Sequence, residues 1–321
     1  MTTLDESPEA TRVSLPVLAT SMWSSSRFAL DLLQFVAVDQ PLIDRIILMA
    51  ITQANVQPIM FLPELQRTYA TLQALPPEEV RRPVSINALS AMLRIPFETA
   101  RRHVHLLIAK GVCELVADGA RVPASAIGHA EISSGLAAIY ELAKAMYAYL
   151  HQCDCFIATQ SAAALDIDVP PIRAVVRLSL DHALRAIEGA TSLTDDLADA
   201  LLLLTVWLEN IDHGEVPASS GRWLLSDAHR LPITAAKLAG KLGISESTVH
   251  RRLKKGVRKG WCRISPRGAV IPADFLACQK FVRAMSVNHS NLLRLFNQLS
   301  RLGVLEHWDA TRKRPARLRR I

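Results

Sequence analysis

The stretch from residue 231 to residue 272 reads LPITAAKLAGKLGISESTVHRRLKKGVRKGWCRISPRGAVIP. Leu238 and Leu242 are four residues apart and therefore share one helix face. Gly243 can take the left-handed conformation that a tight turn needs, so this helix should end there. Ser245 is a good N-cap for a second helix. The stretch therefore predicts two short helices joined by a tight turn.

A β-hairpin is predicted directly after the second helix. Residues 261–264 and 269–271 are short strand-like runs, and the residues between them are Ser, Pro, Arg and Gly, a turn by composition. With this hairpin the stretch resembles the large group of bacterial winged helix-turn-helix transcriptional regulators. The resemblance implies a transcriptional regulator that binds double-stranded DNA.

The same stretch is written twice in the chain. Residues 81–124 align with residues 230–273 at a constant offset of 149 without a gap, and 14 of the 44 positions are identical. In the first copy Arg94 stands for the turn glycine and Pro96 for the second N-cap. Such a repeat indicates two copies of one folding unit. We therefore expect a mainly α fold with two duplicated winged helix-turn-helix units, each with flanking helices and a small β-hairpin wing.

Apolar helical patterns before and after each copy extend the duplication and set the expected domain boundaries. The chain is expected to comprise a flexible N-terminal segment (1–24), a first unit (25–151, motif 84–123), a linker (152–175), a second unit (176–305, motif 233–272) and a basic C-terminal tail (306–321).

Composition narrows the class of protein. The 321 residues contain no uncharged apolar run long enough for a membrane span, and the N-terminus is too polar for a signal peptide. We therefore expect a cytoplasmic, nucleoid-associated protein without membrane contact. The H-x-C-x-C run at 151–155 lacks the second ligand pair of a zinc site, so we expect no metal or other cofactor. Phosphate-binding loops and catalytic motifs are missing from the sequence, so we expect no enzyme.

The net charge of +7 is distributed unevenly along the chain. Residues 233–272 contain ten Lys or Arg and a single acid, whereas residues 84–123 contain five Lys or Arg and three acids. The last eleven residues add six more cations without an acid, which leaves the remainder of the chain acidic. A basic module on an otherwise acidic protein is typical of phosphate binding.

The second helix of such a motif enters the DNA major groove. Periodicity places Arg251, Ser247 and His250 on the outward face of this helix. There Arg251 can make two hydrogen bonds to a guanine, and Ser247 and His250 can hydrogen-bond to base edges or to phosphate. The other cations of this helix are expected to contact phosphates. The arginines of the hairpin are expected to enter the minor groove. The set predicted to contact DNA in the second unit is Thr234, Ser245, Glu246, Ser247, Thr248, His250, Arg251, Arg252, Lys254, Lys255, Arg263 and Arg267.

The first unit offers a weaker set, namely Arg101, Arg102 and His105. Its hairpin carries Glu114 and Asp118 where the second has arginines, and acids there would repel the DNA backbone. The second unit should therefore dominate DNA affinity. Three roles stay open for the first unit: weaker binding, recognition of a different half-site, or a homodimer surface.

Two other functions share this pattern of tandem units. Plasmid-type replication initiators also carry two winged-helix domains in one chain. Accessory proteins of chromosome condensation use tandem winged helices to bind protein instead of DNA, although such a module does not need the concentration of positive charge in residues 233–272. The charge therefore favours DNA binding over a protein-interaction module, and a genomic position beside repeated origin sites would favour the initiator.

Overall fold

The computed structural model describes residues 13–36, 39–127, 130–155, 169–211, 224 and 226–313. The fold is mainly helical, with two small antiparallel hairpins of two strands each. The first half contains α1 (Leu15–Leu32), a 3-10 turn (Leu33–Phe35), α2 (Leu42–Phe61), α3 (Pro63–Thr68), a 3-10 turn (Glu78–Val80), α4 (Ile86–Leu93), α5 (Phe97–Ala109), β1 (Glu114–Val116), β2 (Gly119–Arg121), α6 (Ala124–Ile127) and α7 (Ala130–Gln152). The second half contains α8 (Ile172–Thr194), α9 (Leu197–Glu209), a 3-10 turn (Asp227–His229), α10 (Ala235–Leu242), α11 (Glu246–Arg258), β3 (Arg263–Ser265), β4 (Gly268–Val270), α12 (Ala273–Ala277), α13 (Gln279–Arg301) and α14 (Val304–Lys313).

The second motif, residues 233–272, has the predicted order of helix, turn, helix and hairpin. Thr234 caps α10 by accepting a hydrogen bond from the Lys237 amide, and Ser245 caps α11 in the same way. Gly243 joins the two helices at a φ of 63°, in the left-handed region. Two side-chain caps and one glycine therefore set the helix boundaries that the sequence predicted.

The first motif, residues 84–123, keeps the same order despite its substitutions. Arg94 takes the left-handed turn at a φ of 52°, where the second motif has glycine. Pro96 lies at the N-cap position before α5, as its alignment with Ser245 indicated, and provides no side-chain cap. The tight turn survives without its glycine.

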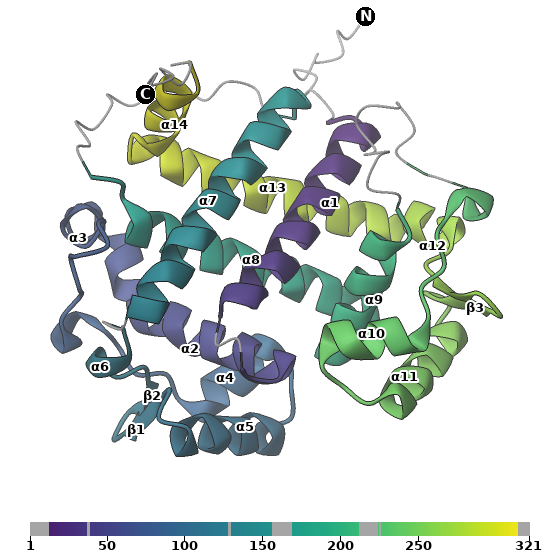
Figure 1. The fold of residues 1–321 in the computed structure, drawn as a ribbon, viewed down its shortest axis with the longest axis horizontal. Coiled ribbons are helices and arrows are strands. Elements are labelled where there is room, and N and C mark those ends of the chain that lie inside the picture. Colours follow the sequence, from purple (N-terminus) through teal and green to yellow (C-terminus); the bar gives the residue numbers. More distant parts are fainter. Residues whose placement is uncertain are drawn as a thin grey trace, which may run out of the picture.

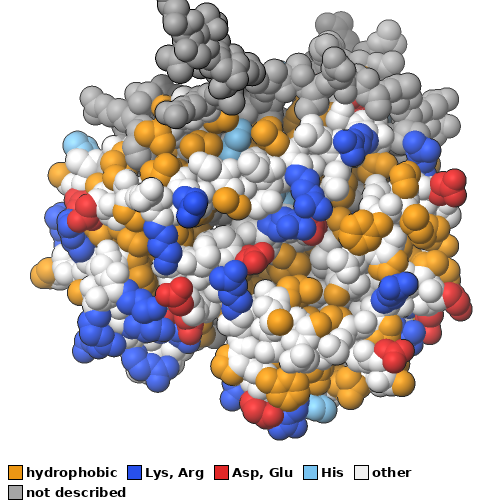
Figure 2. All heavy atoms as spheres, turned by 180° about the vertical axis from the view of Figure 1, so that it is seen from behind, with side chains coloured by type: hydrophobic (Ala, Val, Ile, Leu, Met, Phe, Trp, Pro, Cys, Tyr) orange, Lys and Arg blue, Asp and Glu red, His pale blue; other side chains and the backbone are white. Residues whose placement is uncertain are grey.

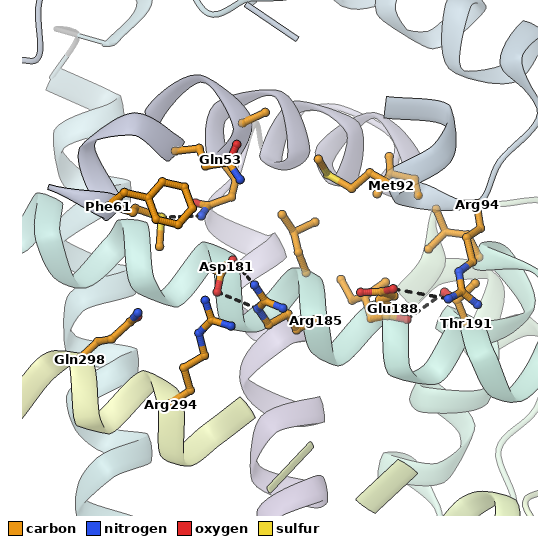
Figure 3. A pocket seen from close by; sticks show the side chains of 17 residues that line it. Gln53, Phe61, Met92, Arg94, Asp181, Arg185, Glu188, Thr191, Arg294 and Gln298 are labelled. Atoms are coloured by element: carbon orange, nitrogen blue, oxygen red, sulfur yellow. Dashed lines mark hydrogen bonds and ion pairs between the residues drawn. The ribbon is translucent and has the colours of Figure 1, made fainter. Parts of the chain in front are cut away.

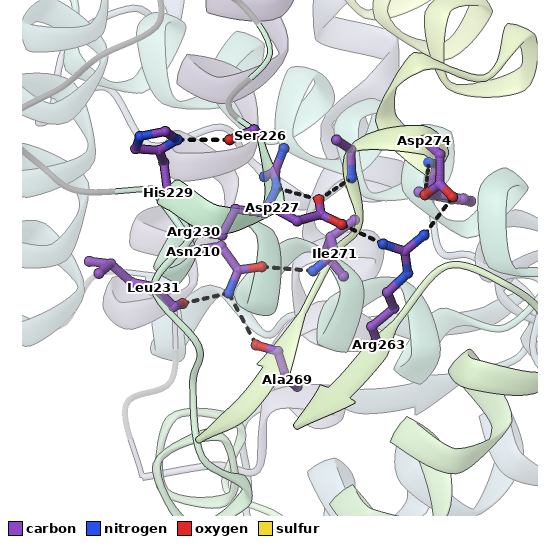
Figure 4. Close-up of polar contacts among 12 residues, drawn as sticks. Asn210, Ser226, Asp227, His229, Arg230, Leu231, Arg263, Ala269, Ile271 and Asp274 are labelled. Carbon is purple, nitrogen blue, oxygen red and sulfur yellow. Dashed lines mark hydrogen bonds and ion pairs between the residues drawn. The ribbon is translucent and has the colours of Figure 1, made fainter. Parts of the chain in front are cut away.

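The two halves also repeat a buried hydrogen-bonding group. The Asn55 side chain donates to the carbonyls of Arg82 (2.8 Å) and Ala120 (3.2 Å) and accepts from the Val122 amide (3.0 Å). Asn210 does the same with the residues 149 positions later, as Figure 4 shows. Each asparagine therefore ties the helix before the motif, α2 or α9, to the hairpin.

Helices from both halves pack together in one common core, with α1 and α8 at its centre. α1 packs against α7, α8, α9 and α13, and α8 packs against α2 and α7 as well as α9 and α13. These helices cross in the middle of the molecule, and the two motifs lie along its lower edge (Figure 1). The buried apolar residues make one continuous cluster. The halves are consequently interleaved and do not stand apart as two separate cores.

Three predicted boundaries need correction. Residues 15–24 belong to helix α1, where Leu18 and Met22 are buried, so they are not a flexible segment. The linker is shorter at both ends, because α7 reaches Gln152 and α8 begins at Ile172. The basic tail begins as α14, whose Trp308 is buried and donates to the Tyr140 hydroxyl at 2.8 Å. The rest of the tail, 314–321, and most of segments 1–14 and 152–171 lie outside the described residues.

No helix in the described part of the chain is both long enough and apolar enough to cross a bilayer.

Candidate nucleic-acid interface

Helix α11 has three distinct faces. Val249, Leu253 and Gly256 face the core. A second face carries Ser247, His250, Arg251, Lys254 and Arg258, all of them exposed, and we call it the exposed stripe. A third face carries Arg252, Lys255 and Lys259, which we call the anchored stripe. The two polar faces follow from the spacing of three, four and seven residues within each set.

The anchored stripe is bound to the corner between α8 and α9. Arg252 contacts Asp199 at 2.6 Å and Asp196 at 2.9 Å, and Lys255 lies 2.5 Å from Asp199. The Asp199 side chain is fully buried, so it needs these cations to compensate for its lost hydration. The charged groups of Arg252 and Lys255, both predicted at phosphates, thus attach α11 to the core of the protein.

The electrostatics of Asp196 agree with this attachment. Burial by itself would raise the pKa of its carboxyl group. The Asp199 amide that donates to it, together with the Arg252 and Lys255 cations, outweighs burial and holds this pKa below its usual value. Asp196 is also the N-cap of α9, so one carboxylate fixes the start of α9 and the side of α11.

The exposed stripe keeps its charge available to solvent. Arg251, Lys254 and Arg258 have no ion-pair partner within the described part of the chain. Lys237 on α10 and Arg267 in the turn of the hairpin are exposed in the same way. Seen from behind, Lys and Arg side chains gather at the lower left, on the side of α10 and α11 (Figure 2). Sequence reasoning left Lys237 and Arg258 out of the site, although Arg258 follows Arg251 by seven residues and so shares its face.

The smaller polar residues at the start of α11 mostly contact one another. Ser245 Oγ accepts from the Thr248 amide at 3.3 Å and lies 2.8 Å from Thr248 Oγ1 and 3.1 Å from Ser247 Oγ. Glu246 lies 3.4 Å from His250, one turn later. Ser245 and Thr248 therefore have structural work as caps, as does Thr234 on α10, while Ser247 and His250 stay exposed among the predicted base contacts.

Arg263, on the first strand of the second hairpin, is also paired with carboxylates of the protein. Arg263 contacts Asp227 at 2.5 Å and Asp274 at 2.7 Å, and the two carboxylates flank its guanidinium (Figure 4). Asp227 in turn accepts from the Ala273 amide at 2.7 Å. Two carboxylates thus hold Arg263, whereas Arg267 has no ion-pair partner among the described residues, so the two arginines predicted in the minor groove differ in their surroundings.

The first motif has a different balance of partners. Arg101 is held by Glu98 at 2.8 Å, and Arg121 by Glu114 at 2.8 Å. Arg102 and His105 are exposed at the positions of Arg251 and Lys254. The exposed surface of this motif also carries apolar side chains, with Phe97 45%, Leu106 44% and Leu115 50% exposed. Its surface is thus both less cationic and more apolar than that of the second motif.

The cysteines of the two motifs occupy equivalent buried positions. Cys113 and Cys262 are 3% and 2% exposed, and burial raises their pKa to about 11 and about 12. Both thiols are therefore protonated and behave as small apolar side chains. Among the described residues no three His, Cys, Asp or Glu side chains gather as a metal site would require.

The chain was compared with models of protein families, with curated proteins and with solved structures, and no match was found in any of the three.

Proposed function

We propose that this protein is a DNA-binding transcriptional regulator and that its second motif acts as a winged helix-turn-helix. The observation that carries the proposal is the division of cations on α11. Three cations pair with carboxylates at the corner between α8 and α9, whereas Arg251, Lys254 and Arg258 have no ion-pair partner among the described residues and lie opposite the buried face of the helix. Unpaired cations along one exposed helix face suit a helix that lies in the major groove.

The neighbouring elements support the same orientation. Lys237 on α10 and Arg267 at the hairpin turn add cations on either side of α11 in the sequence. Phosphate contacts from these positions would fix the register of the helix, while Ser247, His250 and Arg251 reach base edges. At the positions of Arg251 and Lys254 the first motif has Arg102 and His105. Its Arg101 is paired with Glu98 and its surface exposes apolar side chains, so we assign it the smaller share of the affinity.

The proposal is tested by removing the exposed stripe without disturbing the core. Each alanine substitution at Arg251, Lys254 or Arg258 should cost about 1–3 kcal/mol of binding to duplex DNA, or reduce the salt dependence by about one ion, according to whether a base or a phosphate is lost. Fluorescence anisotropy with the selected target and with unrelated DNA, over a series of salt concentrations, separates the two cases. Because the three side chains are exposed and unpaired, the melting temperature should not change.

A matched control is Arg301→Ala, which removes an exposed cation at the far end of α13. It should leave DNA affinity and salt dependence as they are. If the triple variant of the exposed stripe binds DNA as tightly as the parent protein does, the helix does not lie in the groove and the proposal fails.

A further inference from the structure

A cavity of about 330 Å³ lies between the two halves of the molecule. Helix α8 forms its floor, α2 and the end of α4 form one wall, and α13 forms the other (Figure 3). Ligand pockets in proteins start at about this volume, and they are commonly found where two structural units meet. The volume is enough for a compound on the order of ten non-hydrogen atoms.

The cavity contains polar groups whose bonding capacity the protein does not use. Gln53 of α2 is only 7% exposed, yet among the described residues its Oε1 has no hydrogen-bond partner and its Nε2 contacts the sulfur of Met60 alone, at 2.8 Å. A buried amide without a polar partner is costly, because it has lost its hydration without compensation. The Oε1 atom is closed off from solvent in the structure, so a bound ligand with a polar group would satisfy it once the Gln53 side chain turns toward the cavity.

The opposite wall provides positive charge. Arg294 of α13 lies near the pair formed by Asp181 and Arg185 of α8 (Figure 3). Arg185 is occupied by that carboxylate, with Nε 2.9 Å from Asp181, whereas Arg294 has no ion-pair partner in the described ranges. A free guanidinium at the mouth of a cavity suits a carboxylate, which it can bind through two parallel hydrogen bonds.

Another part of the lining is apolar, and some of its side chains are partly exposed. Phe61 is 68% exposed and Met92 is 41% exposed, and both border the cavity together with Met60, Leu184 and Ile187. Large apolar side chains beside a hollow gain from contact with an apolar ligand, since this removes their surface from water. These three features of the lining are the unsatisfied amide, the free arginine and the apolar rim. Together they suit one molecule that has both an acidic and an apolar part.

We propose that this cavity binds a small organic acid with an apolar body, whose carboxylate is held by Arg294 and whose apolar part packs against Phe61 and Met92. The ligand contacts α2 and α4 of the first half as well as α8 and α13 of the second. Arg94, the left-handed turn of the first motif, lines the cavity and lies 3.5 Å from Glu188 of α8. The far end of α8 is bound to α11, since Lys259 donates to the Thr194 carbonyl at 2.9 Å.

This position gives the ligand a route to both motifs. A ligand shifts the arrangement of the halves if it binds one arrangement more tightly than another. In this step, which rests on the proposed DNA binding, the acid changes the affinity for DNA. The binding of the acid itself does not depend on DNA.

The site is tested on the full chain without DNA. Octanoate is the probe, and 1-octanol of the same chain length is the uncharged control; binding is followed by titration calorimetry and by the melting temperature. We expect octanoate to bind saturably at millimolar concentration and octanol to bind at least about tenfold more weakly, because it lacks the charge-assisted hydrogen bonds. Arg294→Gln should weaken octanoate at least about tenfold, Arg294→Lys should weaken it less, and Arg301→Ala should have no effect.

Equal binding of octanoate and octanol, or octanoate binding that Arg294→Gln leaves unchanged, would overturn the site. A second measurement adds octanoate to the anisotropy experiment with DNA. A change in DNA affinity that Arg294→Gln abolishes supports the coupling. Saturable octanoate binding with no such change overturns the coupling alone, and absence of DNA binding with octanoate bound overturns the proposed function alone.

Discussion

At the scale of single residues, Asp199 carries much of the attachment of α11. Its buried carboxylate contacts both Arg252 and Lys255. Asp199→Asn keeps the shape but removes the charge that compensates two partly buried cations, so we expect a loss of about 3 kcal/mol in the free energy of unfolding. Denaturant unfolding measures it. Asp195→Asn is the matched control, because Asp195 is 72% exposed and its pair with Lys259 should be worth less than about 1 kcal/mol. Equal losses in the two variants would contradict this account.

A second prediction at this scale concerns pH. His182 is buried against Ser25 of α1, with Nε2 3.0 Å from Oγ, and burial lowers its pKa from 6.5 to about 4. The nearby Asp181 raises this pKa and Arg185 lowers it, but both effects are smaller than that of burial. Since the unfolded chain takes up the proton first, stability is complete above about pH 6.5 and falls by about 3 kcal/mol towards pH 4.

Urea unfolding between pH 7 and pH 4.5 tests the pH prediction. His182→Gln can still bond Ser25 but cannot be protonated, so its stability should vary less with pH. Burial also lowers the pKa of His289, which accordingly contributes in the same direction. Some pH dependence therefore remains in the variant, and an unchanged dependence would exclude His182 as its source.

The sequence predicted a cationic α11 but not which of its cations are free. Periodicity separates Val249 and Leu253 from the polar positions, because apolar burial repeats along the helix itself. Arg252 is paired with Asp196 and Asp199, which lie more than fifty residues earlier in the chain. Contacts between such distant positions depend on the packing of α9 against α11, which no local pattern contains.

At the scale of elements, each hairpin depends on a glycine. Gly268 has a φ of 135°, and a Cβ there would lie 2.5 Å from the Ile233 carbonyl oxygen. Gly268→Ala should therefore cost about 1–3 kcal/mol for the backbone conformation alone, and more for the clash. Gly240→Ala is the matched control in α10, where a Cβ has open space and should stabilise the helix by about 0.5–1 kcal/mol. Thermal unfolding compares them, and similar melting temperatures for both would be evidence against a rigid hairpin.

Elements with clear local signals were predicted, and those without them were missed. The caps of α10 and α11 and the turn at Gly243 are short-range features that the sequence states directly. Helix α1 was missed because its buried surface includes Ser21 and Ser25, which break the apolar period. These serines bond buried side chains of α8 and α13, with Ser21 Oγ 2.9 Å from His289. The helix is therefore stabilised by partners far away in the sequence.

At the scale of the whole molecule, the interleaved core should make the halves interdependent. α1 and α7 lose their contacts with α8 and α13 if the chain is divided within residues 156–168. We expect fragments 1–160 and 161–321 to lack fixed tertiary structure when separate, because each exposes the apolar faces of its long helices. Near-ultraviolet circular dichroism of the fragments, alone and mixed, tests this expectation. The intact chain should unfold in a single transition, and two transitions assigned to the two halves would refute a common core.

The inequality of the two motifs has a consequence for direction along DNA. Two identical motifs related by a two-fold axis recognise a palindrome, and such a complex is unchanged when the duplex is reversed. Here one molecule carries a cationic α11 at one end of its lower edge and, at the other, an α5 whose Arg101 is paired and which exposes Phe97 and Leu106 (Figure 1). If both motifs touch the duplex, reversing the DNA exchanges a strong contact for a weak one. The preferred site should then be asymmetric, and the bound protein should have a polarity that points the same way on every copy of that site.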